Sequence, residues 1–223
     1  MSHTIDHSTV AATPRLSRLQ AVALVAAPAL AVVARVLITP WYQDDANRPD
    51  NSRVLTEVAD SVGRNQAGAV LAVLSATLFV VAAIVVGGIV RARSPRVAWA
   101  GVVLAGFGAF GLALFSAFVG VITIMAGHDD REAMLELMTL LNDSAVAGVS
   151  FLVLVLGAVG WLFLGYGLYR AAPIPRAAAV VSAIGVAGVM LTTPGPAIAY
   201  IAGSAVLCLL GFAWVALAAQ RRS

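Results

Sequence analysis

The chain has 223 residues, of which 61% are apolar and only 11% charged, and its mean hydropathy is +0.93. An ordinary soluble domain is about half apolar and about a quarter charged, so this composition excludes a water-soluble globular protein. Six membrane crossings of about 20 residues each would leave no room for a soluble catalytic domain. The net charge of +3 does not indicate a nucleic-acid partner, because the 14 basic residues are spread thinly and form no basic block.

Six apolar runs follow one another along the chain, and each has roughly the length of a transmembrane helix. About 20 apolar residues cross a bilayer core, and the runs lack the alternation of a barrel strand. We therefore expect an all-α polytopic membrane helix bundle with both tails, 1–18 (disordered) and 220–223, in the cytoplasm. The six transmembrane helices of its single domain, 19–219, are expected at 19–38, 67–90, 97–126, 145–169, 177–193 and 197–219.

The basic residues indicate how the bundle is oriented. All 14 are arginines, a usage that suggests a G+C-rich bacterial genome. Cytoplasmic loops carry the basic excess in membrane proteins, and nine arginines fall before span one, between spans two and three, between spans four and five, or after span six. The two loops on the other side carry four arginines and ten of the 11 acidic residues. We therefore expect an inner-membrane protein with both termini in the cytoplasm.

Each of the two long outer loops is predicted to contain a short amphipathic helix. In 51–66 the apolar positions Val54, Leu55, Val58, Ala59 and Val62 share one helical face. In the second loop Asp129 and Glu132 resemble a capping box. The apolar face that follows contains Met134, Leu135, Leu137, Met138 and Leu141. These helices are expected either to lie in the outer headgroup layer or to cover the end of the bundle.

Small residues recur every fourth position in the third span. Helices in lipid associate through close backbone approach, which small residues permit. This stripe predicts that the third span lies at the centre of the bundle, with helix-packing residues Gly101, Ala105, Ala109, Ala113 and Ala117.

Chemically active side chains are scarce in the predicted spans. Among the Asp, Glu, His, Lys and Arg residues, only Arg35 falls within a predicted span. It lies three residues from the outer end of the first span. It is expected either to extend toward the headgroups or to bind a lipid phosphate or an anionic ligand. Trp41, His128 and Asp129 are further candidate contacts of a ligand or lipid on the outer face. Trp161, Tyr166, Tyr200 and Trp214 lie deeper and are candidates to line a cavity.

The spacing of the remaining polar residues predicts no catalytic, cofactor-binding or metal site. His128, Asp129 and Asp130 form no recognisable metal motif, and the single cysteine, Cys208, is expected to be a buried, inert thiol. The glycines at 106, 108 and 111 spell G-x-G-x-x-G, but no strand precedes them, as a dinucleotide site requires.

One short stretch resembles a known kind of protein. The sequence from Leu168, Tyr169 and Arg170 to Ile174, Pro175 and Arg176 is similar to the cytoplasmic turn of small bacterial six-helix integral membrane proteins without an assigned activity. The resemblance implies a six-helix membrane protein, and no functional residues are carried over from it.

The leading functional prediction is a non-enzymatic multi-pass membrane protein. Its outer face is expected to bind a lipid, an apolar small molecule or a membrane partner, which includes a second copy of the chain. The alternative is a small permease or the membrane subunit of an exporter. A polar-lined, water-accessible cavity between the spans would favour transport, whereas a sealed bundle with an apolar groove below the outer helices would favour binding.

Overall fold

The computed structural model describes residues 16–39, 50–171, 174–192 and 198–220, and the secondary structure in these ranges is helical throughout. The expected all-α bundle is therefore confirmed. In chain order the helices are α1 (Arg18–Leu37), α2 (Asn51–Ala59), α3 (Val62–Arg91), α4 (Pro95–Ala126), α5 (Arg131–Asn142), α6 (Ala145–Arg170), α7 (Arg176–Thr192) and α8 (Ile198–Gln220).

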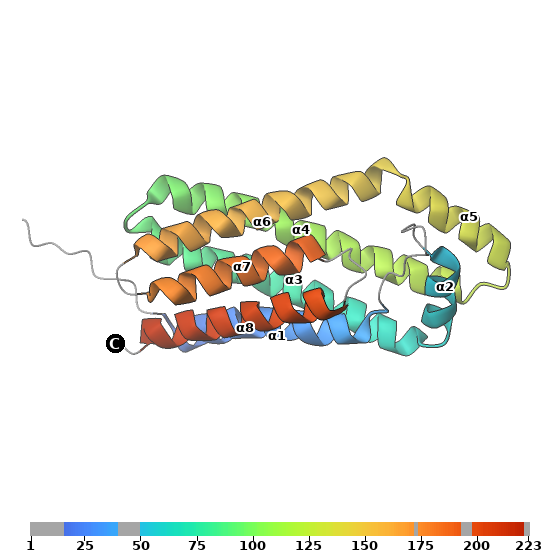
Figure 1. Cartoon of the computed structure of the whole chain (residues 1–223), viewed down its shortest axis with the longest axis horizontal. Helices are drawn as coiled ribbons and strands as arrows, with labels where there is room; N and C mark the ends of the chain where they lie inside the picture. Colours follow the sequence, from blue (N-terminus) through green and yellow to red (C-terminus); the bar gives the residue numbers. More distant parts are fainter. Residues whose placement is uncertain (1–15, 40–49, 172–173, 193–197, 221–223) are drawn as a thin grey trace, which may run out of the picture.

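Six long helices run along one common direction, and the short helices α2 and α5 lie together at one end of the bundle (Figure 1). Four complete helices (α1, α3, α4 and α6) and the segment Gly203–Gln220 of α8 are long and apolar enough to cross a membrane. Helix α7 has 17 residues, which gives a length of about 26 Å against a hydrocarbon core of about 30 Å.

The helix bounds agree with the six predicted runs except at the start of α3. Residues 62–66, which the periodicity assigned to the first amphipathic helix, belong instead to α3. The break falls at Asp60 and Ser61, where the Ser61 hydroxyl donates to the carbonyl of Glu57 at 2.6 Å. The shorter α2 still buries Val54, Leu55 and Val58.

The two ends of the bundle differ in charge. One end holds the start of α1, the α3–α4 turn, the α6–α7 turn and the end of α8 (Figure 1), and we call it the arginine end. Its charged residues in the described part of the chain are Arg18, Arg91, Arg93, Arg96, Arg170 and Arg176. The opposite end, which carries α2 and α5, is the cap end. It holds every acidic residue of the described ranges: Asp50, Glu57, Asp60, Asp129, Asp130, Glu132, Glu136 and Asp143.

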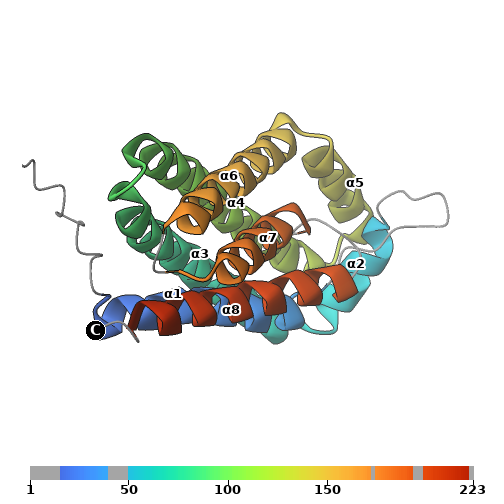
Figure 2. The same cartoon turned by 60° about the vertical axis from the view of Figure 1, so that its left-hand side comes forward.

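Helices α2 and α5 pack on protein and on each other at the cap end. They form a separate apolar cluster with the projecting end of α4, made of Val54, Leu55, Val58, Ile122, Met125, Ala126 and Met138. Arg131 of α5 donates to the carbonyl of Ser52 at 3.1 Å and to the Thr56 hydroxyl of α2. Asn51 donates to the hydroxyl of Thr139 at 3.2 Å. Both views place the pair across the same end of the bundle (Figure 2).

Glycines bring α4 and α6 into backbone contact. A Cβ atom built on Gly157 would lie 2.2 Å from the Cα of Gly108, and one on Gly160 would lie 2.3 Å from the backbone nitrogen of Ala105. Gly101 likewise meets Leu164, since its Cβ would lie 2.8 Å from that side chain. Helix α4 therefore lies between α3 and α6, in close contact with the latter. The prediction that this span lies at the centre of the bundle is wrong, because α4 packs mainly on these two helices and its opposite face is exposed.

The predicted stripe of small residues follows this contact only in part. Gly101, Ala105 and Ala109 are buried, whereas Ala113 is half-buried and Ala117 is exposed. The reason is geometric. A spacing of four residues turns by about 40° per step on a helix of about 3.6 residues per turn, so the stripe rotates away from α6. The contact continues instead through Gly108 and Gly111.

Candidate ligand-binding site

Arg35 lies in the last turn of α1 and reaches across to α4. The central carbon of its guanidinium group is 4.9 Å from the centre of the Phe115 ring. A cation at this distance from an aromatic face is attracted by the ring quadrupole, and more strongly where water is excluded. The contact therefore directs the positive charge toward the interior of the bundle near the cap end.

A small cavity of about 20 Å³ adjoins this side chain. That volume accommodates about one water molecule or one oxygen atom of a ligand. The Ser75 hydroxyl donates to the carbonyl of Ala27 at 2.7 Å, and the Ser116 hydroxyl donates to the carbonyl of Leu112 at 2.7 Å. Each serine oxygen can therefore still accept a hydrogen bond but has no proton left to donate. Residues from α1, α3, α4 and α7 form the lining: Ala31, Ala34, Arg35, Ile38, Ala72, Ser75, Leu112, Phe115, Ser116 and Val189.

No carboxylate among the described residues balances the positive charge of Arg35. Within the described ranges no acidic side chain forms an ion pair with Arg35, and no hydrogen bond to it occurs. A guanidinium group offers five N–H donors that fit carboxylate and phosphate oxygens. A cavity with one cation and mostly apolar walls is therefore suited to the acidic head of an otherwise apolar molecule.

A buried polar network links α1 to α3 at the edge of the cavity. Asn65 is fully buried, and its side-chain oxygen accepts from the backbone N–H of Thr39 at 2.8 Å. Its amide nitrogen donates to the Thr39 hydroxyl at 3.0 Å and to the carbonyl of Ser61 at 3.1 Å. The adjoining Ile38 lines the cavity, so this network positions the wall next to Arg35.

Asn65 and Phe115 were not among the residues predicted to form a site. An Asn three residues into α3, next to a long apolar run, is a signal that sequence analysis can detect. Phe115, by contrast, becomes significant only once α1 and α4 are known to meet, because nothing in its local sequence indicates an arginine partner.

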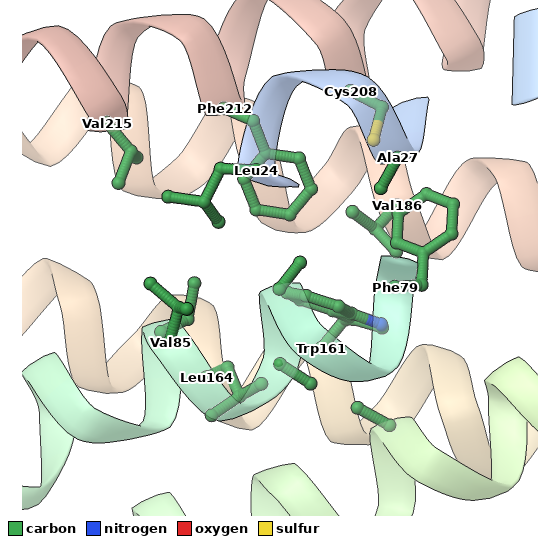
Figure 3. Close-up of a cluster of buried hydrophobic side chains, with 14 of the residues drawn as sticks. Leu24, Ala27, Phe79, Val85, Trp161, Leu164, Val186, Cys208, Phe212 and Val215 are labelled. Carbon is green, nitrogen blue, oxygen red and sulfur yellow. The ribbon is translucent and has the colours of Figure 1, made fainter. Parts of the chain in front are cut away.

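Aromatic side chains fill the centre of the bundle between the cavity and the arginine end. The ring centres of Trp161 and Phe212 are 5.3 Å apart, those of Trp161 and Phe79 are 6.1 Å apart, and both pairs meet edge to face. Figure 3 shows Trp161 of α6 surrounded by side chains of α1, α3, α7 and α8. Trp161 is 2% exposed and its indole nitrogen has no hydrogen-bond partner. It is therefore a core residue, and it is not part of the cavity lining.

The other deep aromatic residues have different positions. Tyr166 lines a groove at the arginine end, and Trp214 is exposed on the surface of α8. The side chain of Tyr200 lies outside the described residues.

The other candidates on the outer face do not join Arg35. His128 and Asp129 are exposed in the α4–α5 turn and are not part of the cavity lining. Asp130, and not Asp129, caps α5, since its carboxylate accepts from the backbone N–H of Ala133 at 3.1 Å. Trp41 lies outside the described residues.

No cluster in the described ranges has the composition of a metal site, which would require three or more neighbouring His, Cys, Asp or Glu side chains. Cys208 is a fully buried free thiol.

Comparison with protein-family models, with curated proteins and with solved structures finds no match for this chain. The function of the chain is therefore inferred from the geometry of the molecule.

Proposed function

We propose that the chain is a non-enzymatic multi-pass protein of the bacterial inner membrane that binds the acidic head of an amphiphile at Arg35. The observation that carries this proposal is the guanidinium group of Arg35, which adjoins an apolar cavity and has an aromatic ring as its partner within the described residues. An ionisable residue at membrane depth usually has a functional role, and the chemistry of this one selects a carboxylate or a phosphate.

The proposed membrane orientation follows from the charges at the two ends. The arginine end faces the cytoplasm, because basic residues concentrate on the cytoplasmic side of membrane proteins. Helices α2 and α5 then lie on the outer side, and the ligand reaches Arg35 from the outer leaflet. The short α7 is the sixth span in this arrangement, with a locally thinned bilayer or a tilted neighbour accommodating its length.

Binding is better supported than transport. The aromatic side chains of Phe79, Trp161 and Phe212 occupy the bundle centre between the cavity and the arginine end. Transport through the bundle would require this packed layer to open. A permease or exporter subunit is therefore the less favoured reading.

The test compares a long-chain carboxylate with the alcohol of the same chain length, because the pair differs only in the acidic head. In detergent, oleate is expected to raise the unfolding temperature of the chain more than oleyl alcohol does. Arg35→Leu is expected to weaken oleate binding by about 10- to 100-fold, since a hydrogen bond to a charged group contributes about 1.5 to 3 kcal/mol.

Arg53→Leu is the control variant, because Arg53 is an exposed arginine of α2 that pairs with Glu57 away from the cavity. Anionic phospholipid, tested in the same way, shows whether a lipid headgroup or a free acid is preferred. Equal stabilisation by oleate and oleyl alcohol would contradict the proposal, as would undiminished oleate binding by a folded Arg35→Leu variant.

A further inference from the structure

A second hollow lies at the arginine end, between α6 and α7, and it differs in form from the Arg35 cavity. It is a groove of about 340 Å³. Its floor is made of small residues, because α6 and α7 approach so closely that a Cβ on Gly165 would lie 2.3 Å from the Cβ of Ala183. Larger side chains that are 41–55% exposed stand on either side of this floor: Leu162, Tyr166, Tyr169, Val180 and Ile184.

Two arginines stand where this groove reaches the α6–α7 turn. The guanidinium carbon of Arg170 is 5.8 Å from the ring centre of Tyr166, and Arg170 donates to the Tyr166 hydroxyl at 3.3 Å. The guanidinium carbon of Arg176, at the start of α7, is 5.1 Å from the ring centre of Tyr169. Both tyrosines belong to α6 and line the groove, so the α6 wall carries two tyrosine rings near the turn, each with a cation close to its ring.

No carboxylate in the described part of the chain balances these cations. The described acidic residues lie at the cap end, on the opposite side of the bundle. Arg93 lies nearby as well, and it donates to the backbone carbonyl of Arg170 at 3.2 Å. The head of the groove is therefore a cationic site with no carboxylate among the described residues beside it.

We propose that this groove binds an anionic phospholipid, with one acyl chain along the groove and its phosphate between Arg170 and Arg176. The apolar length of the groove fits hydrocarbon, and basic pockets between helices at the cytoplasmic surface are a recurrent mode of anionic-lipid binding. A second copy of the chain fits poorly, because a symmetric contact would bring the same arginines together. This inference rests on the membrane insertion proposed above, but it is independent of the Arg35 site.

The experiment is native mass spectrometry of the full chain in detergent with added phosphatidylglycerol or phosphatidylcholine of identical acyl composition. Phosphatidylglycerol is expected to bind about 10- to 30-fold more tightly, since each arginine near an anionic surface contributes about a fivefold gain in affinity and there are two of them. The double variant Arg170→Gln, Arg176→Gln is expected to lose that preference and to retain its weak affinity for phosphatidylcholine.

The matched control is Arg18→Gln with Arg96→Gln, which removes the same charge from the same end but leaves the groove intact. This pair is expected to change phosphatidylglycerol affinity by less than about twofold. If the double variant fails to fold, Val180→Trp provides a second test, because it fills the groove without removing charge, and it is expected to reduce binding of both lipids.

Equal affinity of the parent chain for the two lipids would overturn the proposal. An equal loss of phosphatidylglycerol affinity in the two double variants would also overturn it and indicate a diffuse electrostatic attraction. Arg35→Leu is expected to leave phosphatidylglycerol retention at the groove unchanged. In the parent chain, absence of a preference for phosphatidylglycerol together with tight oleate binding would therefore refute the groove alone, and absence of oleate binding together with an intact lipid preference would refute the Arg35 site alone.

Discussion

At the scale of single residues, the polar side chains in this bundle are few and most have a defined partner. Asn65 shows the pattern most clearly, because its side-chain amide forms hydrogen bonds with both Thr39 and Ser61. A buried polar group without a partner costs about 1 to 3 kcal/mol, so most such groups in an apolar environment make their bonds. The indole nitrogen of Trp161 is an exception inside the packed core. Arg35 is an exception beside a cavity, and for that reason it is the best candidate for a ligand contact.

Replacing Asn65 with leucine is expected to destabilise the chain. Asn65→Leu removes the acceptor of the Thr39 N–H and the donor to the Thr39 hydroxyl, which are buried groups. We expect a loss of about 1 to 3 kcal/mol, measured as a lower unfolding temperature in detergent. Gln66→Leu is the control, because Gln66 is the neighbouring residue and is exposed. Equal stability of the two variants would contradict the role assigned to Asn65.

At the scale of the elements, close packing of α4 against α6 depends on glycine. Gly157→Ala would place a Cβ atom 2.2 Å from the Cα of Gly108 and 2.8 Å from its backbone nitrogen. Backbone atoms of a packed helix cannot move aside as a flexible side chain can. We therefore expect overpacking to lower the free energy of unfolding by about 1 to 3 kcal/mol. The measurement is again the unfolding temperature in detergent.

The matched control for this prediction is Gly148→Ala on the same helix, where nothing lies within 4 Å of the added Cβ. Alanine is a better helix former than glycine by about 1 kcal/mol, so this variant is expected to be at least as stable as the parent chain. If Gly157→Ala were equally well tolerated, α4 and α6 would not be in backbone contact.

Helix positions were largely predictable from the sequence, whereas helix contacts were not. The predicted ends of the six long apolar runs lie within two residues of the observed helix ends except at the start of α3, where the difference is five. The agreement is close because desolvation of an apolar backbone requires helix formation. The stripe on α4 was less informative. It indicated a contact face, but small residues are equally tolerated toward lipid, so Ala117 fitted the pattern and is nevertheless exposed.

The candidate sites were less predictable still, because each depends on helices that are distant in sequence. Arg35 was recognisable alone, as a charge within an apolar run. Its ring partner Phe115 and the cavity between four helices require knowledge of how the helices assemble. The groove at Gly165 and Ala183 likewise arises where two helices approach, and no local motif marks it.

At the scale of the whole molecule, the charges separate along the bundle axis. The described acidic residues lie at the cap end, and six arginines lie at the arginine end. The proposed groove site depends on this separation, because no acidic residue of the described ranges lies beside the cations of the arginine end. In the proposed orientation the two sites face opposite leaflets. Membrane insertion with the arginine end in the cytoplasm is therefore the central claim.

Labelling of single cysteines in intact cells tests this claim most directly. Cysteines are introduced at Ser94, in the α3–α4 turn, and at Asp129, which is exposed beside the cap residue Asp130. The parent chain is the blank, because its Cys208 is fully buried. An impermeant thiol reagent is expected to label Asp129→Cys from outside and Ser94→Cys only after the membrane is opened. Labelling of both positions from the same face, or recovery of the chain in aqueous extract without detergent, would contradict the account.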